Sequence, residues 1–299
     1  MSWQLSLINS GLRYLVKPQL KREHNPQRSR RLFEWFAGRF AKPPPYSVLS
    51  HSSSGSWVSC GRPTPRRVIL YLHGGGYFAG SPRTHSAMVA RLCKLTRTRA
   101  YLPTYRLAPE NPLSAGLDDA KAAFARLQGL GYKAEDIILC GDSAGGGLAL
   151  RLLAALSSQN ITPAAVVLMS PWTDLTLSGA TLAENAKSDV IFPPDRSEFL
   201  RDLVLGAGDA TVPEVSPLFA DFPNAPPVFL QWSSSEILSS DSQRMTARLH
   251  EFGVPVTEDI WPNMPHVWPL FDGYLPEARC ALQRMADFIN SVAPTKSDS

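Results

Sequence analysis

A glycine-rich turn with one serine, Ser143, joins a strand pattern to a helix pattern near the middle of the chain. Residues 136–140 before the turn are mostly apolar, as in a buried strand, and residues 148–156 after it have the Leu/Ala spacing of a helix. Glycines beside the serine relieve the crowding of a sharp turn, and a helix N-terminus favours developing negative charge. The pattern therefore predicts a nucleophilic Ser143 held off the sheet; an ordinary glycine-rich turn with an incidental serine is the alternative.

Strand and helix patterns alternate along most of the chain, which predicts an α/β fold. Right-handed crossovers between such strands build a mostly parallel central sheet flanked by helices, with catalytic loops at the carboxyl ends of the strands. We expect a hairpin at 47–59, strands at 67–72, 100–105, 136–140, 164–169, 227–232 and 254–261, and helices at 86–95, 113–127, 148–156, 242–252 and 277–292.

The 299 residues, 44% hydrophobic and 19% charged, have an ordinary globular composition without repeats or low-complexity blocks. A single catalytic domain with an embedded helical cap accounts for this length. The catalytic domain is predicted at 46–174 and 216–292. The cap would combine residues 1–45 with an insertion at 175–215, where the strand and helix alternation stops, and 293–299 would be a loose tail.

The basic excess of the chain lies at its N-terminus, where residues 1–40 contain eight Lys/Arg and two Glu while the whole chain has a net charge of +4. Such a segment would attract an anionic lipid or a nucleic acid. Interleaved apolar residues favour the alternative, a packed amphipathic segment of two helices with a break near Pro18 or at Asn25-Pro26. These apolar residues are Leu12, Leu15, Val16, Leu32, Phe33, Trp35 and Phe36.

No cationic leader with an apolar core opens the sequence, and no window of about 18 apolar residues would span a membrane. The four cysteines are far apart, without the C-x-x-C spacing of zinc or redox sites. We therefore expect a cytoplasmic protein with no metal, no organic cofactor, no nucleic-acid partner and no stable membrane insertion. The edge strand at 254–261 would allow a homodimer.

A serine hydroxyl needs a neutral imidazole to take its proton and a carboxylate to orient that imidazole. His266 is the predicted base because it follows the last predicted strand, where a hydrolase sheet presents this group. Two acids, Glu236 and Asp241, follow the preceding strand. Glu236 is preferred because it lies nearer the strand end, whereas Asp241 is expected to cap the next helix. The choice between the two acids stays open.

The chain resembles the hormone-sensitive-lipase-like branch of the α/β-hydrolases, the bacterial family IV carboxylesterases, in three segments: HGGG at 73–76, YRLAPE at 105–110 and GDSAGG at 141–146. The glycine run at 73–76 directly follows a predicted strand, and its N–H groups are free for an oxyanion, although glycine runs are also common in flexible loops. The resemblance covers about residues 45–292 and implies an α/β-hydrolase fold with a cap.

The resemblance also implies roles for single residues. Gly75, Gly76 and Ala144 would donate the oxyanion-hole N–H groups, and His73 would shape the glycine loop without acting as the base. The family usually has Asp-Pro-Leu where this chain has Glu-Ile-Leu, so Glu236 is a departure from its pattern.

The predicted function is that of a serine esterase acting on short- to medium-chain carboxylic esters through an acyl-enzyme, with the triad Ser143, Glu236 and His266. The candidate residues of an apolar substrate pocket are Tyr77, Trp172 and Trp268. The same triad could instead hydrolyse lactones or amides. A ligand-binding protein on this fold is the alternative from another class, and the presence of a catalytic base argues against it.

Overall fold

The computed structural model describes residues 1–64 and 66–292. Its strands are β1 (Ser47–Ser52), β2 (Gly55–Cys60), β3 (Val68–Leu72), β4 (Arg99–Pro103), β5 (Ile137–Asp142), β6 (Ala165–Met169), β7 (Val228–Ser233) and β8 (Val256–Trp261). They form one sheet of eight strands in the order β1-β2-β4-β3-β5-β6-β7-β8, in which β3 to β8 are parallel and β2 is antiparallel to both neighbours. The mostly parallel sheet is confirmed, and the predicted tail at 293–299 lies outside the described residues.

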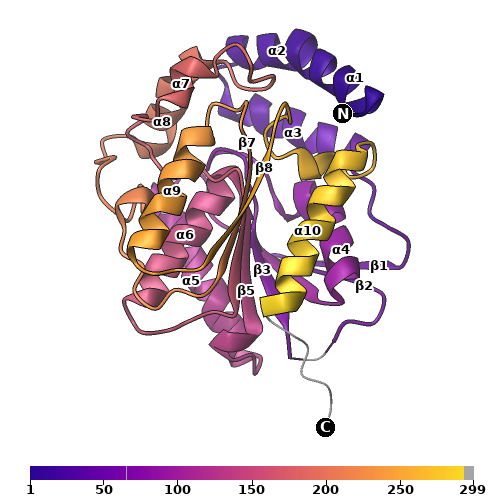
Figure 1. Cartoon of the computed structure of the whole chain (residues 1–299), viewed down its shortest axis with the longest axis vertical. Coiled ribbons are helices and arrows are strands. Elements are labelled where there is room, and N and C mark those ends of the chain that lie inside the picture. The colour runs from indigo at the N-terminus through magenta and orange to yellow at the C-terminus, as the bar shows by residue number, and fades with distance from the viewer. Residues whose placement is uncertain (65, 293–299) are drawn as a thin grey trace.

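Helices cover both faces of the sheet. The helical elements in the described residues are α1 (Trp3–Gly11), η1 (Leu12–Val16), α2 (Lys17–Arg22), α3 (Pro26–Phe40), α4 (Pro82–Thr96), α5 (Leu113–Gly129), η2 (Ala134–Asp136), α6 (Ser143–Ser157), α7 (Thr181–Glu184), η3 (Pro194–Arg196), α8 (Ser197–Leu205), η4 (Pro217–Phe219), α9 (Ser239–Glu251), η5 (Trp268–Phe271) and α10 (Pro276–Val292). α4 and α10 lie on one face, and α5, α6 and α9 lie on the other (Figure 1). Strands β3, β5, β6 and β7 are therefore buried along their whole length.

The N-terminal helices break at Asn25-Pro26, one of the two alternative places that the sequence predicts. α1, η1 and α2 continue without interruption to Arg22, so the chain does not break at the other alternative, Pro18. η1 is a π-helical segment just before this proline, and its wider turn makes room for a ring that would clash with the preceding turn of a regular helix. The chain turns at 23–25, where the Asn25 side chain caps α3 by accepting the Arg28 N–H (3.0 Å).

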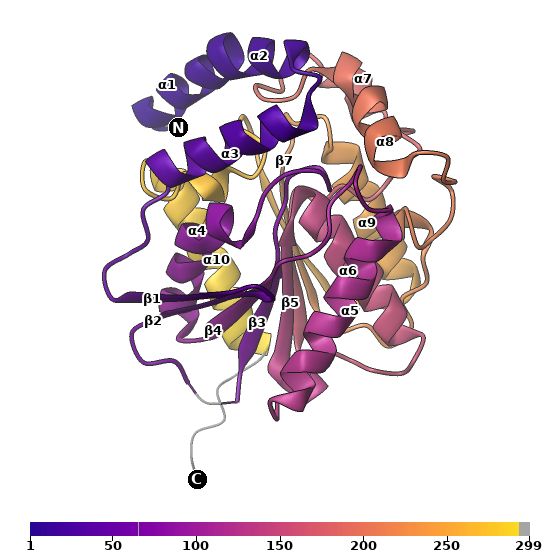
Figure 2. The same cartoon turned by 180° about the vertical axis from the view of Figure 1, so that it is seen from behind.

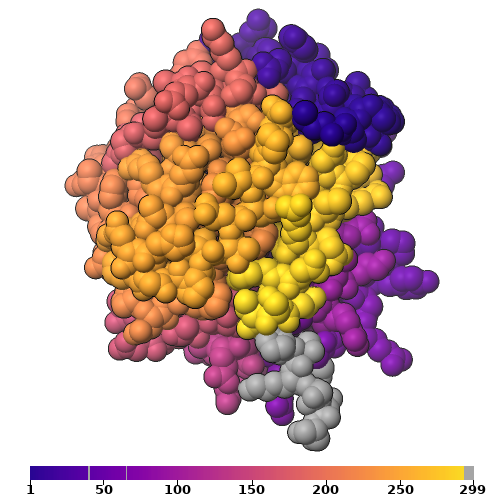
Figure 3. Space-filling model, in the orientation of Figure 1, coloured from indigo at the N-terminus to yellow at the C-terminus, as the bar shows by residue number. Residues whose placement is uncertain are grey.

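α1 packs against the C-terminal part of the chain, as the space-filling view shows (Figure 3). Ser2 donates its N–H and its hydroxyl to the Glu277 carboxylate at 2.7 and 2.8 Å, and Leu5 is buried against η5 and α10. The expected packing of the apolar N-terminal residues is wrong for Leu15 and Trp35, which are 73% and 64% exposed. Only one side of each N-terminal helix packs against the rest of the protein. The side chains of Leu15 and Trp35 lie on the opposite side, which faces solvent.

The insertion at 175–215 forms α7, η3 and α8, which lie near α1 and α2 at the carboxyl edge of the sheet (Figure 2). α1 reaches the same edge through Asn9, whose side chain donates to the Asn263 carbonyl oxygen (3.0 Å) in the loop after β8. The division into a catalytic domain and a cap stays a prediction. Within the described ranges, every helix is either too short or not apolar enough to cross a membrane.

We expect Gly145→Ala to lower the free energy of unfolding by about 2 kcal/mol or more, whereas Gly129→Ala should leave it unchanged or slightly raised. A Cβ on Gly145 would lie 2.1 Å from the Leu72 carbonyl oxygen and 2.4 Å from that of His73, because α6 closely approaches the end of β3. A Cβ on Gly129, the last residue of α5, meets nothing within 4 Å. Urea denaturation measures both variants, and equal stabilities would contradict this packing.

Candidate active site

Ser143 is the first residue of α6 and directly follows β5. Its φ of 52° lies in the left-handed region that favours glycine, so the backbone is strained at this sharp turn. The Ser143 carbonyl oxygen accepts the Trp172 N–H (3.0 Å), which holds the turn against the loop after β6. Ser143 is only 8% exposed, so the turn presents its serine in an enclosed site.

The glycine loop lies beside this turn because β3 and β5 are neighbouring parallel strands. Asp142 holds the loop: its Oδ1 accepts the Gly74 N–H (2.9 Å) and the Tyr71 hydroxyl (2.6 Å). Its Oδ2 lies 3.3 Å from His85 Nε2. Burial opposes ionisation of Asp142, but the imidazole of His85 and the hydrogen bonds outweigh burial and lower the pKa of this carboxyl. An ionised acceptor therefore anchors the loop.

Two N–H groups of the glycine loop, those of Gly75 and Gly76, have no acceptor among the residues that the structure describes. Gly75 has a φ of 122°, and a Cβ there would lie 2.2 Å from the Ala79 carbonyl oxygen, so only glycine fits. Ala144 adds an N–H from the first turn of α6, where no side chain caps the helix. These three N–H groups belong to the two turns that follow β3 and β5.

Glu236 and His266 come together because they follow β7 and β8, which are also neighbouring parallel strands. His266 Nδ1 lies 2.5 Å from Glu236 Oε2, and both side chains are buried. Glu236 Oε1 accepts the Ser170 hydroxyl (2.7 Å) and the Ser233 N–H (2.9 Å), so the carboxylate is fixed at both oxygens. His266 Nε2 is buried without a hydrogen-bond partner in the described part of the chain, which leaves it free for a group that reacts.

Charge and packing define the state of the His266 imidazole. Burial acts to lower the pKa of His266, but the charge and hydrogen bond of Glu236 outweigh it, so the pKa is raised above its ordinary value. Asp189 and Asp142 contribute in the same direction. The Phe192 ring lies edge-on to the imidazole, with 4.8 Å between ring centroids. The imidazole is thus held by a carboxylate and an aromatic ring.

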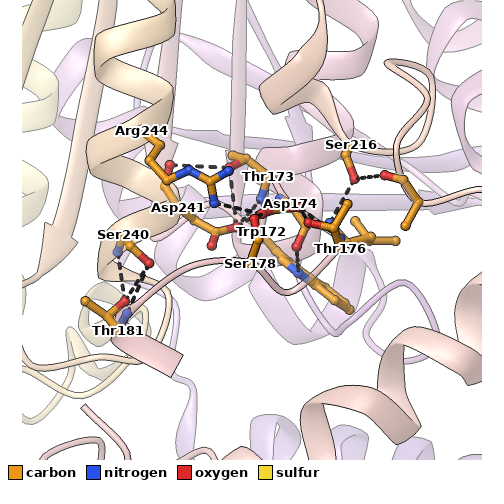
Figure 4. A network of polar contacts seen from close by, with 12 residues as sticks. Trp172, Thr173, Asp174, Thr176, Ser178, Thr181, Ser216, Ser240, Asp241 and Arg244 are labelled. Carbon is orange, nitrogen blue, oxygen red and sulfur yellow. Dashed lines mark hydrogen bonds and ion pairs between the residues drawn. The ribbon is translucent and has the colours of Figure 1, made fainter. Parts of the chain in front are cut away.

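Asp241 is not the helix N-cap that the sequence predicts. α9 begins at Ser239, and Asp241 lies in its first turn with the carboxylate directed at the loop after β6 (Figure 4). Its Oδ2 accepts the N–H groups of Thr173 (2.8 Å) and Asp174 (2.9 Å). Burial raises the pKa of Asp241 to about 7. Asp241 therefore ties α9 to that loop, whereas the carboxylate that bonds His266 is the one preferred from the sequence.

His73 is buried beside the glycine loop. Its Nδ1 lies 2.9 Å from the Gly74 carbonyl oxygen, and its ring stacks on Tyr105 with 4.3 Å between centroids. Burial lowers the pKa of His73 to about 3, so this ring is neutral near pH 7. A neutral, stacked ring supports the loop as a structural element.

The three predicted pocket residues are all buried. Tyr77 and Trp172 lie side by side, with 5.8 Å between ring centroids. Trp268 has no exposed surface and packs with Trp261 and with Leu5 of α1. A role of Tyr77, Trp172 and Trp268 in substrate binding stays a prediction.

Groups of three or more His, Cys, Asp or Glu side chains placed to hold a metal ion do not occur within residues 1–64 and 66–292. The four cysteines are free thiols, of which Cys280 is exposed and the others are buried. Burial raises the pKa of Cys93 and of Cys140, so these two thiols stay protonated.

Several residues that contact the candidate pair or its loop were not singled out from the sequence, among them Ser170, Phe192 and Asp189. Ser170 bonds Glu236, Phe192 packs on His266, and Asp189 accepts the N–H of Ile237. Ser170 directly follows a predicted strand, so its position at the carboxyl edge of the sheet could have been predicted. The other two lie in the insertion, which has no periodic pattern that would point to them.

Comparisons with known proteins agree on one family. A family model described as the alpha/beta hydrolase fold matches residues 69–270. The chain is 33% identical to an acetyl-hydrolase of Streptomyces hygroscopicus over 255 residues, 85% of this chain and 85% of that protein. It is 35% identical to an esterase of Acinetobacter venetianus over 232 residues, 76% of this chain and 75% of that protein.

Solved structures give the same result. An esterase from the bacterial hormone-sensitive lipase family is similar with a TM-score of 0.92 and 32% identity, over 98% of this chain and 99% of that chain. EstE5, in a crystal soaked with p-nitrophenyl butyrate, is similar with a TM-score of 0.92 and 31% identity over the same shares. The predicted fold class and family are confirmed: the chain belongs to the α/β-hydrolase family, in the hormone-sensitive-lipase-like branch of bacterial carboxylesterases.

Proposed function

We propose that this carboxylesterase hydrolyses short- to medium-chain carboxylic esters through an acyl-enzyme formed on Ser143. The observation that carries the proposal is the buried pair of His266 and Glu236, whose imidazole keeps one nitrogen free at the edge of the sheet where Ser143 follows β5. A histidine oriented by a carboxylate is the base that a serine nucleophile needs. A protein that only binds ligands would not need this base.

In the first half of the reaction, His266 Nε2 takes the proton of the Ser143 hydroxyl while the serine oxygen attacks the ester carbonyl carbon. The N–H groups of Gly75, Gly76 and Ala144 stabilise the oxyanion, and losing one such donor costs about 3 to 4 kcal/mol. His266 then protonates the alkoxy oxygen as its bond to the carbonyl carbon breaks. The alcohol departs and the acyl group stays on the serine.

In the second half, His266 takes a proton from water, and the resulting hydroxide attacks the acyl carbonyl. The bond between that carbon and the serine oxygen breaks, the imidazole returns its proton to the serine, and the carboxylic acid leaves. Glu236 orients the imidazole and stabilises its charged form in both halves.

The enclosed position of Ser143 supports small acyl groups, because an enclosed site limits the size of the ligand that it accepts. The name of the Streptomyces relative, an acetyl-hydrolase, also supports a small acyl group. The same triad would also hydrolyse lactones and amides. The cytoplasmic location, the absence of a nucleic-acid partner and a homodimer through β8 stay predictions.

Ser143→Ala should lower kcat/KM for p-nitrophenyl butyrate by about 10⁴-fold or more, because no acyl-enzyme can form. Ser114→Ala, at an exposed position of α5, is the matched control and should keep wild-type activity. Turnover is followed by absorbance of released p-nitrophenol. An active Ser143→Ala protein would remove Ser143 from the mechanism, and a wild type that binds short esters without turnover would favour the ligand-binding alternative.

In the pH profile, kcat/KM should fall as the pH is lowered. The apparent pKa of this acid limb should lie above about 6.5, the ordinary value for histidine. Only neutral His266 can take the serine proton, and Glu236 raises the pKa of the imidazole. Activity is therefore lost as the pH falls through this raised pKa. Initial rates in a series of buffers at constant ionic strength measure the profile, and an acid limb below about 6 would contradict the pairing.

Glu236→Gln should lower kcat by about 10³ to 10⁴-fold and move the acid limb to lower pH, because the charge that stabilises the imidazolium is lost. Asp241→Asn is the matched amide variant. Its amide oxygen can still accept the N–H groups of Thr173 and Asp174, so kcat should stay within about threefold of wild type. Steady-state kinetics compare the two, and full activity of the first with loss in the second would transfer the role to Asp241.

A further inference from the structure

Asp189 is a buried carboxylate in the insertion, 3% exposed, that joins two segments at the active site. Its Oδ1 accepts the N–H groups of Ile191 (2.7 Å) and Phe192 (2.8 Å), which fixes the turn that follows it. Its Oδ2 accepts the N–H of Ile237 (2.9 Å), the residue next to Glu236. One side chain thus connects the insertion to the loop that carries the triad acid.

The neighbours of Asp189 hold the same loop. Asn185 donates its side-chain amide to the carbonyl oxygens of Ser234 and Glu236, both at 2.9 Å. Ser188 donates its hydroxyl to the Ser235 carbonyl oxygen, also at 2.9 Å. Together with the bond from Ile237, these contacts take up backbone groups of four consecutive residues, 234–237. The loop is therefore held along its length by the insertion.

The turn fixed by Asp189 also reaches the base. Phe192 follows Asp189 by three residues, and its ring lies edge-on to the His266 imidazole with 4.8 Å between centroids. The N–H of Phe192 is bonded to the Asp189 carboxylate, so the position of the ring depends on that bond. Asp189 is thus linked to His266 through Phe192 and to Glu236 through Ile237.

The N-terminal helices hold the insertion from another direction. Lys17 donates its ammonium group to the carbonyl oxygens of Ala186 (2.9 Å) and Asp189 (2.7 Å). Arg13 donates to the carbonyl oxygens of Lys187 (2.7 Å) and Ser188 (3.2 Å). The segment 186–189 therefore lies between η1 and α2 and the loop of the triad acid.

The three backbone partners of Asp189 are all donors, which is the arrangement that suits an ionised carboxylate. Burial raises the pKa of Asp189, and the N–H groups act against that rise. The charged groups that act on His266 are Glu236 after β7, Asp189 in the insertion and Asp142 at the end of β5. All three are acidic and favour the protonated imidazole.

We propose that Asp189 is a positioning residue that sets the geometry of the His266 and Glu236 pair by fixing the loop after β7 and the turn that presents Phe192. The proposal rests on the catalytic roles proposed above. In this proposal the insertion at 175–215 helps to position the catalytic pair in addition to its predicted role in the cap.

The test is Asp189→Asn, which keeps the size of the side chain but removes its charge and one of its acceptor oxygens. We expect kcat for p-nitrophenyl butyrate to fall about 10- to 100-fold with KM changed less than about threefold, because a small displacement of the pair weakens proton transfer. The acid limb of kcat should move to lower pH. Asp209→Asn is the matched control, since Asp209 is exposed and bonds Thr211 in a turn of the same insertion.

A second measurement separates this proposal from the proposed function. In a Ser143→Ala background, titration of the His266 ring signals by NMR should give a lower pKa with Asp189→Asn than without it. This readout does not depend on turnover, so it tests the link between Asp189 and His266 even if the esterase assignment failed. An unmoved imidazole pKa, or an Asp189→Asn enzyme with wild-type kcat, would overturn the proposal.

A variant that does not fold would leave no kinetic result, so Ser188→Ala provides a milder form of the same test. Ser188 is exposed, and its loss removes one contact with the loop while the buried carboxylate remains. We expect a fall in kcat in the same direction, about two- to fivefold, with an unchanged melting temperature. Equal kcat values for this variant and the Asp209→Asn control would count against the proposal.

Discussion

The parallel pairing of the central strands is the constraint on which the active site depends. Neighbouring parallel strands end at the same edge of the sheet, so residues far apart in the chain meet there. Ser143 follows β5 beside the glycine loop after β3, and Glu236 and His266 follow the adjacent strands β7 and β8. Ser170, after β6, lies between these two pairs of strands and bonds Glu236. The sheet therefore brings the proposed nucleophile and its proposed partners to one edge.

Buried carboxylates stabilise the loops along this edge, and Asp142, Asp189, Asp241 and Glu236 differ in the groups that they bond. Asp142, Asp189 and Asp241 each accept hydrogen bonds from backbone N–H groups of another segment, which fixes the relative position of two loops. Glu236 bonds His266 and raises the pKa of this imidazole. The same chemical group thus fixes loops at Asp142, Asp189 and Asp241, and at Glu236 it sets the pKa of an imidazole.

The glutamate in place of the family's usual aspartate has a longer side chain with one more torsion to restrain. The structure meets this requirement with two hydrogen bonds to the oxygen that faces away from His266, from Ser170 and from the N–H of Ser233. The backbone of the loop is held independently by the insertion. A carboxylate fixed at both oxygens on a fixed loop loses little conformational entropy when the imidazole becomes charged.

The sequence by itself determined the α/β alternation, the sharp turn at Ser143, the glycine loop and the loop of His266, because each produces a local pattern of spacing or composition. Tertiary structure decided which acid bonds His266, since Glu236 and Asp241 both follow β7 and only the packing of α9 directs Asp241 to another loop. It also decided the helical course through Pro18, the exposure of apolar N-terminal side chains and the contacts of the insertion. These features arise from contacts between segments distant in the chain, and such contacts leave no periodic signal in a single sequence.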